Sequence, residues 1–167
     1  HVIVNIIEPP NVPAYLEANG KDGRPGWECG LSGGLPGQKI PRQIGGWVPG
    51  ATSGAMPEGT GLGIPPGSLI VVQMHYNTLV AEPTPDQTAI EIATSDTVDR
   101  PASGFLFTNP AFLRPGGMPI AAGDPDARHQ FEIPATLLAI YAGAPAQIKS
   151  TDNWSIHTAF LHMHTLA

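Results

Sequence analysis

Residues 69–76 read LIVVQMHY, an apolar, largely β-branched run that contains a single histidine, His75. The tetrapeptide before it, PPGS at residues 65–68, has the composition of a turn. A short β-branched run that follows a turn predicts a β-strand. This is the clearest strand signal in the chain.

Several other segments carry weaker signals of the same kind. The opening HVIVNII, residues 1–7, predicts a strand that ends at the prolines 9, 10 and 13. Residues 14–19 have room for one or two helical turns before Gly20, and residues 21–46 are glycine-rich and predict a long loop. Further strands are expected at residues 89–94, 104–108, 130–133, 137–141 and 155–165.

The overall composition also indicates a β protein. The 167 residues include 20 glycines and 19 prolines, and 41% of the chain is hydrophobic. Proline interrupts helices and inner sheet ladders, so many short strands joined by tight turns are expected. The polar segment 95–103 is the candidate boundary between two lobes, at residues 1–99 and 100–167.

The charge pattern indicates which classes of binding partner are not expected. The net charge is −6 without clustered Lys and Arg, which argues against nucleic acid or an anionic membrane surface. No apolar run approaches the roughly 20 residues that span a bilayer. The chain opens with His rather than Met, so we expect either a removed leader or an excerpt from a longer protein. Cys29, the single cysteine, is compatible with a small buried hydrophobe, a free thiol, or half of a disulfide whose partner lies outside this chain.

The histidines are the candidates for chemistry. His162 and His164 are two residues apart in a strand context, so both imidazoles project to one side and can hold a metal ion. An H-x-H pair is often incidental, and a histidine in an apolar strand, such as His75, is more often a core residue than a ligand. His1 has no local pattern, His157 is expected on the face opposite the pair, and His129 at the surface. Motifs of hydrolases, zinc proteases and thiol oxidoreductases are missing from the sequence.

Three segments together carry more information than any histidine alone. HVIVNIIEPP, GRPGWECG and GGWVPGATSGAMPEGTGLGIPPGSLIVVQMHYNT, followed by PIAAGDPDARH and FLHMHTLA, resemble the copper type II, ascorbate-dependent monooxygenases. This is the family of peptidylglycine alpha-hydroxylating monooxygenase and dopamine beta-monooxygenase, and the resemblance is greatest to its bacterial members. It covers nearly the whole chain in the right order.

The resemblance implies a ligand set. His1 matches the second of two adjacent histidines, and His75 in the motif Gln-x-His-Tyr matches the third ligand of the same, electron-storing copper. His162 and His164 match the pair that holds the oxygen-activating copper together with a distant methionine. The histidine before His1 and that methionine are both missing here. Gln73 is expected beside His75 as an outer partner, and Tyr76 on the opposite face, where it packs.

The resemblance further implies two jelly-roll-like β-sandwich lobes, the second incomplete, and two copper ions per full-length chain. It implies hydroxylation of a C–H bond of a small-molecule or peptide substrate, with dioxygen and a reductant such as ascorbate. Cys29 matches a disulfide cysteine, so a partner outside the chain and an extracellular or periplasmic location are expected. The alternatives are a non-catalytic β-sandwich binding module and a single-copper polysaccharide monooxygenase that uses an N-terminal histidine.

Overall fold

The structure is a computed structural model that describes residues 1–29, 33–52, 55–77, 79, 82, 84–104, 107–134, 137, 153 and 155–159. The chain divides into two compact units, His1–Phe105 and Leu106–Ala167. Within the described part of the chain, five strands and three short helical segments are present, so the fold is rich in sheet and poor in helix. No helix of the described residues is long and apolar enough to cross a membrane.

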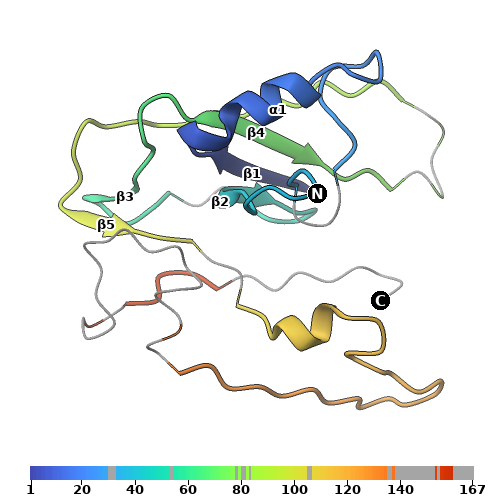
Figure 1. Cartoon of the computed structure of the whole chain (residues 1–167). Helices are drawn as coiled ribbons and strands as arrows, with labels where there is room; N and C mark the ends of the chain where they lie inside the picture. The colour runs from blue at the N-terminus through green and yellow to red at the C-terminus, as the bar shows by residue number, and fades with distance from the viewer. Residues whose placement is uncertain are drawn as a thin grey trace. The chain divides into compact units, whose positions relative to one another are not determined.

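The first unit is organised around a three-stranded sheet. Strand β1 (Val2–Ile7) lies in its centre, with β2 (Arg42–Trp47) on one side and β4 (Leu69–Met74) on the other, and both pairings are antiparallel. Figure 1 shows β1 between its two neighbours. The predicted strands at residues 1–7 and 69–76 are confirmed, each slightly shorter than expected.

The core of this unit is the central strand. Ile6 and Ile7 of β1 are 1% and 2% exposed, and Val2 and Val4 are also buried. These β-branched side chains fit a pleated surface that is covered on both faces. Asn5, in the same strand, is the buried polar residue of this core.

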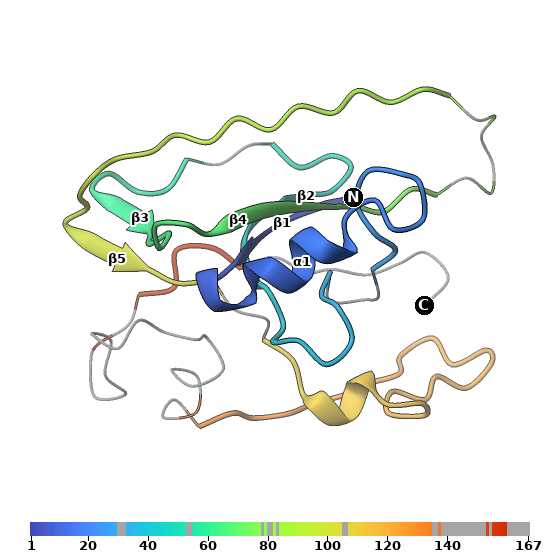
Figure 2. The ribbon, with the colours of Figure 1, turned by 45° about the horizontal axis from the view of Figure 1, so that its top comes forward.

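A short helix follows β1 directly. The 3-10 turn η1 (Pro9–Asn11) leads into α1 (Val12–Ala18), which confirms the helical turns expected before Gly20. Gly20 has a φ of +78°, the left-handed conformation that ends a helix at glycine. Figures 1 and 2 show α1 lying along the sheet. Its Tyr15 is fully buried, with the hydroxyl 3.3 Å from the amide nitrogen of Leu35, which donates to it.

Two predictions in this unit are wrong. Residues 42–46 were expected to be loop, but they form most of β2, because the edge of β1 supplies backbone partners that local sequence does not reveal. Residues 89–94 were expected to be a strand, but they are exposed and make no ladder. A second small sheet pairs β3 (Thr60–Leu62) in parallel with β5 (Arg100–Ala102).

The second unit has little regular structure in its described residues. It contains the 3-10 turn η2 (Pro110–Leu113), which Asn109 caps by accepting a hydrogen bond from the amide of Ala111. Residues 104, 107, 108 and 130–133 are not in strands, contrary to prediction. Most of the strands expected at residues 137–141 and 155–165 lie outside the described residues, and 155–159 are not in a strand.

Candidate functional site

The register of β1 and β4 brings two histidines together that are 74 positions apart in sequence. Val2 pairs with Met74, so His1 lies opposite His75 at the end of the same ladder. The backbone nitrogen of His1 donates to the carbonyl oxygen of His75 at 3.0 Å, and the amide of His75 donates to the carbonyl oxygen of His1 at the same distance. This reciprocal pair fixes both backbones, and therefore both Cβ positions, without any contribution from the side chains.

The two imidazole rings are in contact. Their centroids are 4.7 Å apart and their planes are inclined by 70°. Residues directly opposite each other on an antiparallel pair share a face of the sheet, so both rings project to the same side. His75 is exposed and His1 is half-buried, which leaves the pair accessible from solvent.

This arrangement fits a shared metal ion. Imidazole nitrogen binds such ions at about 2 Å, so two rings on one ion have centroids within about 6 Å of each other. The observed 4.7 Å lies inside that limit. An edge-to-face contact of two rings is also an ordinary cross-strand pair, and the centroid distance is compatible with both arrangements.

The other two predicted ligands, His162 and His164, lie outside the described residues. Among the residues that the structure describes, no group of three or more His, Cys, Asp and Glu side chains is assembled to hold a metal ion. Of the first predicted copper site, the structure therefore describes two ligands, His1 and His75.

The remaining two histidines differ in environment. His157 is exposed, in a segment that forms no strand, so the expected opposite-face placement does not apply to it. His129 was expected at the surface, but it is half-buried, with its ring centroid 5.8 Å from that of Phe112. Its Nε2 is buried without a hydrogen-bond partner in the described part of the chain.

No protein-family model, curated protein or solved structure matches the chain. The resemblance to copper monooxygenases therefore stays a prediction from sequence motifs, and the geometry of His1 and His75 is the structural observation that bears on it.

Gln73 is two residues before His75 in β4 and pairs with Ile3 of β1. Its side-chain carbonyl lies close to Gly33, where an added Cβ would be 2.8 Å from Oε1 of Gln73 and 3.0 Å from Nδ2 of Asn5. Gln73 and Asn5 thus face the same glycine, which has a φ of +68°. The carboxamide of Gln73 is placed against a loop on the face that also carries the two histidines.

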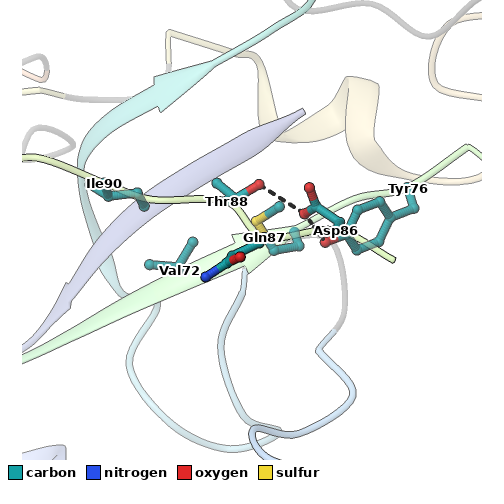
Figure 3. Close-up of a pocket in the computed structure, with 7 residues that line it drawn as sticks. Val72, Tyr76, Asp86, Gln87, Thr88 and Ile90 are labelled. Carbon is teal, nitrogen blue, oxygen red and sulfur yellow. Dashed lines mark hydrogen bonds between the residues drawn. The ribbon is translucent and has the colours of Figure 1, made fainter. Parts of the chain in front are cut away.

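Tyr76, directly after His75, does not pack as expected. It is 57% exposed, and its hydroxyl donates to Asp86 at 2.7 Å. The same carboxylate oxygen accepts from the hydroxyl of Thr88 at 2.8 Å, and Figure 3 shows both bonds. The bond to Asp86 raises the pKa of Tyr76. In return, the hydrogen bonds from Tyr76 and then from Thr88 lower the pKa of Asp86.

These three residues line one end of a pocket that sequence reasoning missed. The pocket has a volume of about 470 Å³ and lies between β4 and the extended segment 86–90. It is lined by Val72, Met74, Tyr76, Asp86, Gln87, Thr88 and Ile90. Residues 86, 88 and 90 are spaced two apart, and in an extended segment such side chains point to one side. This spacing could have indicated one wall of the pocket.

Cys29 is half-buried, and a chain with a single cysteine forms no internal disulfide. Its pairing with a residue outside the chain stays a prediction.

Proposed function

We propose that this chain is part of an extracellular or periplasmic copper monooxygenase that hydroxylates a C–H bond with dioxygen and a reductant such as ascorbate. The observation that carries the proposal is the meeting of His1 and His75 at the end of the β1–β4 ladder, with ring centroids 4.7 Å apart. The order of the sequence motifs around both histidines supports it.

In this proposal His1 and His75 hold one copper ion, and His162 and His164 hold a second in another jelly-roll-like lobe. Bound copper supplies one-electron redox chemistry, which imidazole ligands support. The protein's part is to hold two ring nitrogens toward one point. The ladder does this because the two backbone bonds of 3.0 Å fix the strand ends before any ion binds.

Exposure is also consistent with this role. An electron-storing ion must exchange electrons with a small reductant, so it requires a site that is open to solvent. His75 is exposed and His1 half-buried, which satisfies this requirement. The resemblance implies a small-molecule or peptide substrate. A net charge of −6 without basic clusters gives no attraction for nucleic acid.

Copper binding to the full-length protein tests the proposal. We expect two equivalents of Cu(II), measured by titration and by electron paramagnetic resonance. His75→Ala should remove one equivalent or weaken it by more than the roughly 10–100-fold that loss of an outer partner costs. His162→Ala should remove the other equivalent and abolish ascorbate-dependent hydroxylation.

The matched control is His157→Ala, because His157 is exposed and lies outside both ligand sets. It should leave both equivalents in place. If His75→Ala binds as much copper as the unmodified protein, the assignment of His75 is wrong. A protein that binds no copper at all is instead the non-catalytic module.

A further inference from the structure

The face of β4 that points away from the two histidines carries the pocket described above. Val72, Met74 and Tyr76 line it from this side, and successive side chains of an extended chain alternate, so His75 points to the other face. The pocket volume of about 470 Å³ lies within the roughly 300–1,000 Å³ that is typical of small-molecule sites. The pocket is therefore distinct from the proposed copper site.

The pocket has an aliphatic wall, formed by Val72, Met74 and Ile90. Val72 is 41% exposed and Ile90 is 38% exposed, and Figure 3 shows both side chains at the same end of the pocket. These side chains carry no hydrogen-bonding groups, so this wall favours an apolar part of a ligand, which it would remove from water.

The other end of the pocket, called the polar end below, is formed by Tyr76, Asp86 and Thr88 (Figure 3). The hydroxyls of Tyr76 and Thr88 both donate to Oδ2 of Asp86, at 2.7 and 2.8 Å. An ionised carboxylate only accepts hydrogen bonds, so both hydroxyl hydrogens are directed at Asp86. The two hydroxyl oxygens and the carboxylate retain lone pairs, and the polar end therefore offers acceptors rather than donors.

The charge of the polar end is not balanced by the protein. The hydrogen bonds from Tyr76 and then from Thr88 lower the pKa of Asp86, so its carboxylate is ionised at neutral pH. Among the described residues, the pocket lining contains no Lys, Arg or His, and no ion pair includes Asp86. An ammonium group has three donors, no acceptor and one positive charge, so it complements this end in both respects.

We propose that the pocket binds a primary ammonium ion on a short aliphatic chain, with the nitrogen at the polar end and the carbon chain along the aliphatic wall. Gln87, whose carboxamide both donates and accepts, is the remaining lining residue and is compatible with this ligand. The proposal does not depend on copper, because the pocket contains none of the proposed copper ligands.

Ligand titrations followed by methyl NMR test the proposal. The full-length protein is kept reduced, so that any bound copper is diamagnetic Cu(I). We expect n-hexylamine to cause saturable shifts of the methyl signals of Val72, Met74 and Ile90. Each methylene added between n-butylamine and n-hexylamine should lower the Kd by up to about fourfold. The uncharged n-hexanol should bind roughly tenfold more weakly than n-hexylamine. Absence of saturable shifts, or equal affinity for amine and alcohol, would overturn the proposal.

Asp86→Asn tests the polar end. This variant should lose the preference for n-hexylamine and bind n-hexanol as before. The matched control is Asp96→Asn, which removes the same charge at an exposed position outside the lining and should keep the preference. A preference that persists in Asp86→Asn would place the ammonium elsewhere. Loss of both ligands would show that Asp86 holds the pocket together rather than binds the ammonium. Either result would contradict the assignment.

Ile90→Ala tests the aliphatic wall independently of the charge. Because Ile90 is partly exposed, its truncation should leave the fold intact. The amine should still bind in preference to the alcohol, but the gain in affinity for each added methylene should decrease. An unchanged gain would mean that the carbon chain does not lie along this wall, and the proposed binding mode would be wrong.

Discussion

At the scale of single residues, Gly33 connects the loop after Cys29 to the sheet. Its φ of +68° is a conformation that only glycine adopts without cost, and its Cα faces Gln73 and Asn5. The sequence predicted a loop across residues 21–46, but it could not predict which of its glycines approaches the sheet. That depends on a contact between segments 40 positions apart.

Gly33→Ala should destabilise the first unit through two separate costs. The left-handed backbone costs about 1–2 kcal/mol for alanine, and the contact with Gln73 adds roughly 1–3 kcal/mol. The matched control is Gly23→Ala, because Gly23 has a φ of +80° and nothing within 4 Å of an added Cβ. Chemical denaturation of both variants measures the difference. Equal losses would show that the Gln73 and Asn5 contact contributes nothing.

Asp86 offers a second test at this scale. The hydrogen bond from Tyr76 is the largest cause that lowers the pKa of Asp86. A lowered carboxyl pKa stabilises the folded state above the ordinary Asp pKa, and this stabilisation is lost as the pH falls through the folded value. Tyr76→Phe should therefore raise the pKa of Asp86 toward its ordinary value.

Carboxyl-carbon NMR titration of Asp86 measures this shift directly. Thr88→Val, which removes the second hydrogen bond, should move the pKa of Asp86 in the same direction by a smaller amount. An unchanged titration in Tyr76→Phe would mean that the hydroxyl contact is not made in solution.

At the scale of elements, the sequence predicted those strands that can be recognised from their own residue pattern. The runs at residues 1–7 and 69–76 are β-branched throughout and became β1 and β4. The sequence RQIGGW of β2 carries two glycines and no alternation, and it is a strand because β1 offers it an edge. The AIEIAT segment has the alternation but makes no ladder. A strand forms where a suitable residue pattern meets a neighbouring strand that can pair with it. The sequence shows the residue pattern but not the pairing partner.

The central strand should dominate the stability of the first unit. Ile6 is 1% exposed and lies between β2 and β4, so Ile6→Ala should lower the free energy of unfolding by about 2–5 kcal/mol. Ile40→Ala is the control, since Ile40 is 70% exposed and its truncation should change stability by no more than about 0.5 kcal/mol. Denaturant unfolding followed by far-UV circular dichroism distinguishes them. A small effect at Ile6 would mean that the sheet is not the core.

At the scale of the whole molecule, the candidate site arises from topology. Neither His1 nor His75 has a local metal motif, and spacing alone favours a core residue at position 75. The ladder between β1 and β4 makes them neighbours, and the motif resemblance assigns both to one copper site. The pair His162 and His164 had the stronger local signal, and its geometry lies outside the described residues.

If His1 and His75 share an ion, that ion links the buried central strand β1 to its neighbour β4. An ion that binds only the folded chain stabilises it by about 2.7 kcal/mol at a hundredfold excess over the dissociation constant. Cu(II) should therefore raise the free energy of unfolding by an amount of this order, and a chelator should reverse the gain. In His75→Ala the part of the gain due to this site should disappear, whereas in His157→Ala it should persist, because exposed His157 is not one of the proposed ligands. Thermal unfolding with and without the chelator measures all three proteins. A gain that survives in His75→Ala would place the stabilising ion elsewhere, and the β1–β4 ladder would then hold an ordinary edge-to-face pair of rings.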